Sequence, residues 1–305
     1  MHAPLVVLGG GPGGYAAAFM AADLGMEVTL VEKDTRLGGT CLLRGCIPSK
    51  ALLHVGRVVA EAREMQDWGV HFPTPKIDID AVRSRKEKVI GALTGGLAQL
   101  AKRRNVEVVQ GQAIFTASNT IEVVQKDAGS QTLTFDHCIL ASGSRPARIP
   151  AFDIGSPRVM DSTAALQLED VPDSLLVIGG GYIGLEMGTV YAELGSRVSV
   201  VELTDGLLPG ADPDLVKPLH KRLKGLFEAI RLNTKVVGLK DIGNGVEVSF
   251  EGPDGETTET FSRVLVAVGR RPNSDGLGLE NTNVVVDPKG FVEVDKQQRT
   301  GDAHI

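Results

Sequence analysis

The chain has 305 residues, of which 42% are hydrophobic and 23% charged, and its formal net charge is −6. A chain of this size can bury about two domain cores, and its acidic balance argues against the basic surface that nucleic-acid binding needs. Because three cysteines are too few for a secreted disulfide framework, and no signal peptide or membrane-length apolar run occurs, we expect a cytoplasmic protein with no nucleic-acid or membrane partner.

The first predicted unit is a β-α-β segment at residues 5–32. Its sequence opens with the apolar run LVVL, continues through an Ala-rich helical stretch and ends in a second apolar strand. Gly9, Gly11 and Gly14 have the spacing that allows a tight turn, backbone approach to a pyrophosphate and close packing of helix on strand. Glu32 follows Gly9 by 23 residues, near the distance at which a carboxylate binds an adenosine ribose. The segment therefore predicts a dinucleotide site.

The next segment, residues 37–50, holds Cys41 and Cys46. In a regular helix their Cα atoms would lie about 8.7 Å apart, beyond the limit of about 7 Å for a disulfide, so a bond between them requires a distorted turn. Gly45 and Pro48 suit such a turn and the start of a new helix. A thiol near a helix N-terminus is favoured as thiolate, which suits a redox-exchanging cysteine; the alternative is two unrelated thiols.

Further elements follow in order along the chain. We expect helices at 51–66 and 78–104 and a strand around 106–109. We expect His54, among Leu and Val on the first of these helices, to pack at the edge of a core. Cys138, in the apolar run HCILAS, is predicted to be a buried core residue.

A second β-α-β segment repeats the first at an offset of 170. Residues 175–202 match residues 5–32 at 12 of 28 positions. The glycines recur as Gly179, Gly181 and Gly184, and Glu202 again stands 23 residues after the first of them. A carboxylate there accepts hydrogen bonds from ribose hydroxyls and repels a 2′-phosphate. No Arg or Lys that could bind such a phosphate follows it until residue 217. The second site is therefore predicted to prefer NAD over NADP.

The last part of the chain predicts another helix at 212–229 and a hairpin around residues 287–290, in VVVDPKGFVEVD. No cysteine or histidine cluster of the kind that binds zinc is present, so we expect no metal site.

The run GGTCLLRGCIPSK, between two glycine-rich β-α-β segments, resembles the pyridine nucleotide-disulfide oxidoreductases, and within them the enzymes that oxidise dihydrolipoamide. LASGSRP at residues 140–146 is similar to the segment where the chain leaves the flavin domain in this family. VLVAVGRRPN at residues 264–273 is similar to the end of the family's NAD domain. The resemblance implies FAD on the first glycine turn, NAD on the second, and a redox-active Cys41–Cys46 disulfide. The implied reaction converts dihydrolipoamide and NAD⁺ to lipoamide and NADH.

Residue roles follow from the same resemblance. It implies that Cys41 exchanges with substrate, that Cys46 forms the charge-transfer contact with the flavin, and that Lys50 lies near the flavin and pairs with Glu186. The residues implied in FAD binding, beside the glycines and Glu32, are Lys33, Gly39, Thr40, Lys50, Ala113, Ser142, Gly143 and Ser144. Those implied in NAD binding, beside the glycines and Glu202, are Tyr182, Ile183, Val236 and Gly269. For Tyr182, a plain surface aromatic is an equal alternative.

The expected fold is α/β, with two doubly wound Rossmann-like dinucleotide-binding domains and the NAD domain inserted in the FAD domain. We assign residues 1–144 to the FAD domain with the redox disulfide, 145–270 to the NAD domain, and 271–305 to the truncated start of the return to the FAD domain.

The family pattern continues beyond residue 305, into a dimerisation domain that supplies a His-x-x-x-x-Glu base. None of the six histidines here has Glu five residues later, so we expect a truncated form whose turnover is impaired. The implied partners are lipoyl domains of 2-oxoacid dehydrogenase or glycine cleavage complexes, and the full-length family forms homodimers.

Three alternatives compete with this interpretation. A thioredoxin reductase of the small type would need a Cys-x-x-Cys in the second domain, which has no cysteine after Cys138. Related disulfide reductases generally use NADP, which Glu202 disfavours. The third alternative is a fragment that binds NAD(H) and little FAD.

Overall fold

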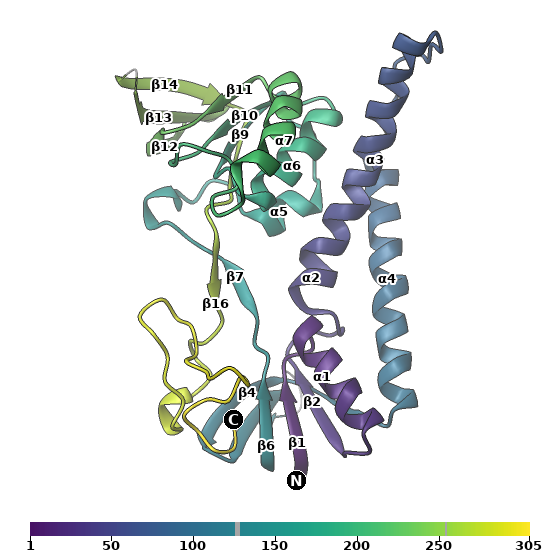
Figure 1. Cartoon of the computed structure of the whole chain (residues 1–305), viewed down its shortest axis with the longest axis vertical. Coiled ribbons are helices and arrows are strands. Elements are labelled where there is room, and N and C mark those ends of the chain that lie inside the picture. The colour runs from purple at the N-terminus through teal and green to yellow at the C-terminus, as the bar shows by residue number, and fades with distance from the viewer. Residues whose placement is uncertain (126–128, 254) are drawn as a thin grey trace. The chain divides into compact units, whose positions relative to one another are not determined.

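The computed structural model describes residues 1–125, 129–253 and 255–305. These residues divide into two compact units (Figure 1). Unit 1 consists of Met1–Cys46, Val89–Arg145 and Arg271–Ile305, and unit 2 of Ile47–Lys88 and Pro146–Arg270.

Unit 1 is built on a six-stranded sheet in the order β3-β2-β1-β6-β5-β4. Its strands are β1 (His2–Leu8), β2 (Val28–Glu32), β3 (Glu107–Gln110), β4 (Gln112–Ala117), β5 (Thr120–Gln125) and β6 (Gly129–Leu140). The β1, β2, β3 and β6 strands pair in parallel, whereas β4 and β5 extend the sheet as an antiparallel meander. Figure 1 shows β1, β2 and β6 side by side, with α1 (Pro12–Asp23) beside them.

The central strand β1 is buried on both faces, as its unbroken apolar run predicts. Leu5 and Val7 pack with Ala18 of α1 in one hydrophobic core. Val6 and Leu8 point into a second core on the other face of the sheet. The strand is therefore the centre of unit 1.

The C-terminal segment contributes to that second core through Leu279 and Val284. It is also held to the sheet by its backbone, since Phe115 N donates to Leu277 O at 2.7 Å and Cys138 N donates to His304 O at 2.7 Å. The segment contains the short 3-10 helix η3 (Leu279–Asn281).

Three helices lie between β2 and β3 in the sequence: α2 (Gly39–Arg44), α3 (Cys46–Glu64) and α4 (Ile79–Arg103), with the 3-10 turn η1 (Met65–Trp68) after α3. Leu52 of α3 belongs to the main core of unit 2, and Leu53 and Val55 pack against that core. This packing explains why Ile47–Lys88 belongs to unit 2, although we assign it by sequence to the first domain. The boundaries at 144/145 and 270/271 remain predictions.

Unit 2 contains a five-stranded parallel sheet in the order β11-β10-β9-β15-β8. Its strands are β8 (Val159–Met160), β9 (Ser174–Ile178), β10 (Arg197–Val201), β11 (Ala229–Arg231) and β15 (Arg263–Val266). Besides α3 and the start of α4, its helices are α5 (Ser162–Gln167), α6 (Tyr182–Glu193) and α7 (Pro213–Leu226). Every residue of β9 is buried, so this strand has the central place that β1 has in unit 1.

A second sheet of unit 2 is antiparallel and has the order β12-β13-β14, with strands β12 (Lys235–Asp241), β13 (Val246–Gly252) and β14 (Gly255–Phe261). The remaining elements are η2 (Pro150–Phe152) and the paired short strands β7 (Ser144–Pro146) and β16 (Arg270–Pro272).

The α/β fold expected from the sequence is confirmed, and both predicted β-α-β segments are present with helices of 12 residues each. The helices predicted at 51–66, 78–104 and 212–229 correspond to α3, α4 and α7, each shifted at its ends by a few residues. The predicted hairpin around 287–290 is reduced to a single antiparallel bridge, Val286 to Val292. Within the residues described, no helix is both long and apolar enough to cross a membrane.

Candidate functional site

The first glycine turn joins β1 to α1 with no space for side chains at two of its positions. Gly9 has φ +107°, and a Cβ there would lie 2.3 Å from Ala141 O. A Cβ on Gly14 would lie 1.6 Å from Gly9 O. Gly11, the N-cap of α1, offers no side chain to the N–H groups of the first turn. The helix N-terminus therefore keeps donors and a partial positive charge that suit a pyrophosphate.

Gly39 lies beside this turn. It has φ +56°, and a Cβ on it would approach Gly11 Cα to 2.6 Å. Two chain segments thus meet through glycine backbone alone, and a side chain on either would block the close approach that a dinucleotide phosphate requires. Thr40, the next residue, donates from Oγ1 to Ser144 O at 3.4 Å.

The second glycine turn repeats the first between β9 and α6. Gly179 has φ +109°, and its Cβ would lie 2.5 Å from Ala267 O. A Cβ on Gly184 would lie 2.3 Å from Gly179 O, whereas one on Gly181 would meet no atom within 4 Å. The open side of Gly181 and the N-terminus of α6, which has no side-chain cap, fit a second phosphate-bearing ligand.

Glu32, at the end of β2, is 7% exposed and is held by backbone donors. Its Oε2 accepts from Gly10 N at 2.6 Å and its Oε1 from Asp34 N at 2.8 Å. Two N–H donors fix the carboxylate beside the glycine turn, where a ribose would lie in this type of fold.

Glu202, at the corresponding position of unit 2, is 8% exposed. Its Oε2 accepts from Gly180 N at 2.6 Å and its Oε1 from Thr204 N at 2.9 Å. The internal repeat thus extends from the sequence to the individual hydrogen bonds.

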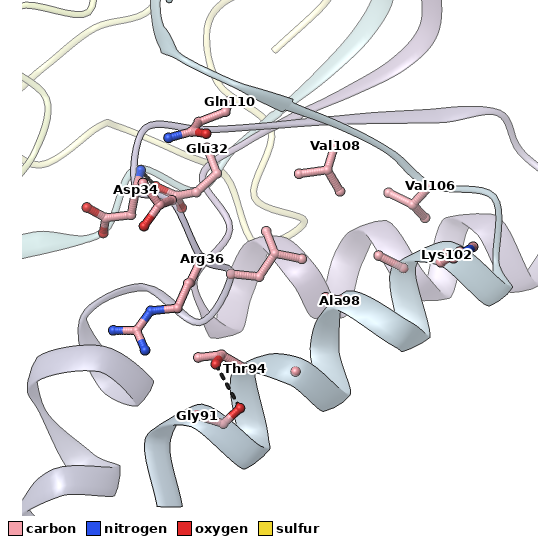
Figure 2. A pocket seen from close by; sticks show the side chains of 14 residues that line it. Glu32, Asp34, Arg36, Gly91, Thr94, Ala98, Lys102, Val106, Val108 and Gln110 are labelled. Atoms are coloured by element: carbon pink, nitrogen blue, oxygen red, sulfur yellow. Dashed lines mark hydrogen bonds between the residues drawn. The ribbon is translucent and has the colours of Figure 1, made fainter. Parts of the chain in front are cut away.

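A cleft of about 750 Å³ opens beside Glu32 (Figure 2). One wall is formed by the ends of β2 and β3 with the loop after β2, and the other by the second half of α4. Figure 2 shows Asp34, Arg36 and Gln110 near Glu32, and Thr94 and Ala98 on the α4 wall. The lining residues that the sequence reasoning missed include Gly91, Thr94, Gly95, Ala98 and Lys102. Apart from Lys102, these are small residues three or four apart on one helix, and that series was the signal in the sequence.

The two-cysteine segment has the distorted turn that the sequence predicts. Gly45 has φ −151° and ψ −115° and separates α2 from α3. Cys41 lies partly buried within α2, and Cys46 is exposed as the first residue of α3. A Cβ on Gly45 would lie 2.8 Å from Thr40 O, so glycine is required where the chain folds back. The disulfide itself remains a prediction.

Lys50 lies one turn after Cys46 on α3, and the predicted ion pair with Glu186 is present. Lys50 Nζ lies 2.5 Å from Glu186 Oε1, with 59% and 27% of the two side chains exposed. Ser49, 5% exposed, donates from Oγ to Glu186 Oε2 at 3.0 Å. Both carboxylate oxygens are therefore engaged, and the orientation of the pair is fixed.

The loop at residues 142–144 is tied to Asn273. Asn273 N donates to Gly143 O at 2.9 Å, and its Nδ2 donates to Ser142 O at 3.0 Å. Gly143 has φ +72°, and a Cβ there would meet no atom within 4 Å. The predicted residues Ser142 and Gly143 are thus held by Asn273, directly before Ser144, the first residue of β7.

The other predicted ligand residues fall into exposed and buried groups. Lys33 and Tyr182 are exposed, and Ile183 is half-buried. Ala113 and Val236 are 4% and 7% exposed, so only their backbone could meet a ligand. Gly269 has φ +123° with open space beside it.

Two predictions about single residues have different outcomes. His54 does not pack at a core edge: it is exposed, because the buried face of α3 runs through Pro48, Ser49, Leu52, Gly56 and Ala60. Cys138 is buried as predicted, at 5% exposure, and burial raises the pKa of its thiol to about 12.

Comparison with known proteins gives consistent results. A sequence model of the pyridine nucleotide-disulphide oxidoreductase family matches residues 3–305. The dihydrolipoyl dehydrogenase of Vibrio cholerae is 51% identical over 306 residues, which cover 100% of this chain and 64% of that protein. That of Haemophilus influenzae is 48% identical over 301 residues, or 99% of this chain and 63% of that one. The chain therefore spans less than two thirds of the length of these relatives.

The solved structures include the Cu(II) complex of the HOCl-induced flavoprotein disulfide reductase RclA from Escherichia coli. It superposes with a TM-score of 0.86 and is 28% identical, and the match covers 100% of this chain and 65% of that one.

Proposed function

Because the chain belongs to the pyridine nucleotide-disulphide oxidoreductase family, we propose that it passes electrons between a dithiol and NAD, with Cys41 and Cys46 as its redox-active disulfide. The observation that carries this proposal is the repeated glycine turn with its buried carboxylate, once on each side of the two-cysteine segment. Dihydrolipoamide is the proposed dithiol, in line with the names of the curated relatives.

The first glycine turn is the proposed FAD site. Gly11 and Gly39 present bare backbone, which suits the close approach of the pyrophosphate, and Glu32 stands at the cleft that suits the adenosine. The second turn, with Gly181 and Glu202, is the proposed NAD site. When bound, FAD supplies a two-electron acceptor for the thiols, and NAD⁺ accepts a hydride.

The chemistry at the cysteines is thiol–disulfide exchange. A substrate thiolate attacks Cys41 Sγ, the Cys41–Cys46 bond breaks, and a mixed disulfide forms while Cys46 leaves as thiolate. The second substrate thiol then displaces Cys41, so the substrate becomes a disulfide and the protein gains two electrons. The N-terminus of α3 places partial positive charge beside Cys46, which suits it as leaving group.

Lys50 and Glu186 are proposed to support this centre electrostatically. The Lys50 ammonium, held by Glu186, stands one turn from Cys46 and adds positive charge beside the developing thiolate.

The proposed partners are lipoyl domains and a second copy of the full-length protein, and the proposed compartment is the cytoplasm. A histidine with glutamate five residues later is not found in this sequence, so full turnover is proposed to need the part of the relatives that this chain does not span.

An anaerobic absorbance experiment tests the proposal. The chain is mixed with FAD, freed of excess, and reduced with one equivalent of dithiothreitol, in parallel with the Cys46→Ser and Cys41→Ser variants. We expect a flavin spectrum in all three proteins. The long-wavelength thiolate–flavin band should appear in wild type only after reduction, and in Cys41→Ser without any reduction. It should never appear in Cys46→Ser.

A colourless preparation that still binds NADH would favour the alternative function, an NAD(H)-binding chain without a flavin centre. A band that persists in Cys46→Ser would refute the assignment of the two cysteines.

A further inference from the structure

The two buried carboxylates differ in one hydrogen bond. Glu32 and Glu202 each accept one N–H from the glycine turn and one N–H from the residue two positions later. Glu202 accepts a further bond, from Thr204 Oγ1 to Oε1 at 2.9 Å. The corresponding residue of unit 1 is Asp34, whose carboxylate pairs with Arg44 instead. The extra donor is therefore a property of the second site.

Thr204 is held in place by its backbone. Its carbonyl accepts from Asn233 N at 2.9 Å. The backbone of Glu202 is fixed on both sides, because its N donates to Arg231 O at 2.8 Å and its O accepts from Thr234 N at 3.0 Å. The hydroxyl of Thr204 is thus presented to the carboxylate by a segment after β10 whose backbone is hydrogen-bonded to residues 231–234.

The hydroxyl proton has two acceptors within reach. Gly206 O lies 3.0 Å from Thr204 Oγ1, about as near as Glu202 Oε1. One O–H donates fully to only one of them, and a carboxylate is the stronger acceptor. The Thr204 hydroxyl therefore donates mainly to Glu202 and restrains the carboxylate. If the hydroxyl rotates away from Glu202, it donates to Gly206 O instead.

We propose that Thr204 is the positioning residue that makes the second site selective for NAD over NADP, by holding Glu202 in the orientation that binds a ribose diol. This inference rests on the proposed NAD site. A carboxylate with three donors does not turn aside easily, so a 2′-phosphate meets a fixed negative charge. Without the hydroxyl, Glu202 keeps its two N–H donors but is held less tightly, which lowers affinity for the diol and lets the carboxylate shift away from a 2′-phosphate.

The test compares dissociation constants of NADH and NADPH, measured by ligand fluorescence, for wild type, Thr204→Val and Thr204→Ser. Valine removes the hydroxyl at constant shape, and serine keeps the hydroxyl as the matched control. We expect the preference for NADH over NADPH to fall about fivefold in Thr204→Val and to stay within twofold of wild type in Thr204→Ser. Crystal structures of wild type and Thr204→Val give a second readout, the side-chain orientation of Glu202.

The outcomes separate the two proposals. If wild type binds no NADH, the proposed function and this inference both fail. If wild type binds NADH and Thr204→Val keeps the wild-type preference, or the Glu202 orientation is the same in both crystals, only the role of Thr204 is overturned. A loss of preference in Thr204→Ser equal to that in Thr204→Val also overturns it, because the hydroxyl would then not be the cause.

Discussion

The close approach of α1 to β1 makes Gly14→Ala a decisive perturbation. The added Cβ would lie 1.6 Å from Gly9 O and 2.8 Å from Gly9 C, whereas real Cβ contacts keep at least 3.0 Å. The helix start and the strand end must therefore separate by about 1.4 Å or distort, and overpacking of this kind costs about 3 kcal/mol. A loss of that size raises the equilibrium constant for local opening of unit 1 roughly a hundredfold.

Gly13→Ala is the matched control. It lies next to Gly14 in the same helical turn, and its Cβ would find only Ala141 Cβ, at 4.0 Å. Alanine lowers the backbone entropy of the unfolded chain equally at residues 13 and 14, but at residue 13 it causes no clash. We therefore expect Gly13→Ala to leave the free energy of unfolding unchanged or to raise it by up to about 1 kcal/mol.

The assay is native-state hydrogen exchange, read by mass spectrometry on peptides from β1, α1 and β2. Peptides from β9 and α6 of unit 2 serve as the internal reference. We expect Gly14→Ala to lose protection in the unit 1 peptides alone. Equal protection in Gly14→Ala and Gly13→Ala would refute the packing that we describe for the first glycine turn.

Three other predictions follow from named residues. Burial raises the pKa of Cys138 to about 12, so at pH 8 its thiol stays protonated, and a thiol reagent should modify it only after denaturant unfolds the chain, as counted by peptide mapping. Burial also raises the pKa of Glu193 above the ordinary value of a glutamate, with Arg63 and Arg222 opposing the shift. The folded chain then binds this proton more tightly than the unfolded chain, so stability falls as pH rises through the folded pKa. Glu193→Gln should therefore flatten the pH dependence of the urea midpoint of unfolding, measured from pH 4 to 8. Because the Lys50–Glu186 pair is partly exposed, Lys50→Met should change the free energy of unfolding by less than about 1 kcal/mol, and a larger loss in urea unfolding would show that the pair has a structural role.

Much of the fold could be predicted because its signals are local. The apolar runs of β1 and β9, the glycine spacing and the terminal glutamates all lie within 28 consecutive residues of each repeat. The break at Gly45 was predictable for the same reason, since the two cysteines it separates are close in sequence.

The features that could not be predicted depend on which distant segments meet. The α4 wall of the cleft lies some sixty residues after Glu32, and periodicity alone does not say which partner a small-residue face meets. The prediction that His54 packs at a core edge was wrong for a related reason, because apolar neighbours in sequence do not determine which side of α3 faces a core. Thr204 was missed, although a hydroxyl two residues after the buried carboxylate was a readable signal.

The three-part construction of unit 1 also determines the order in which the nascent chain can fold. His2 of β1 pairs with Thr134 of β6, and ribosomes add about 5–20 residues per second. One edge of β1 therefore has no partner for roughly 7–25 s after β1 is synthesised, while β2 covers the other edge almost at once. During this interval an apolar strand has an unpaired edge, the condition under which chains associate with one another. Unit 2 needs nothing beyond Arg270 and can complete its core first, so unit 1 is the unit that keeps an unpaired strand edge for longest during synthesis.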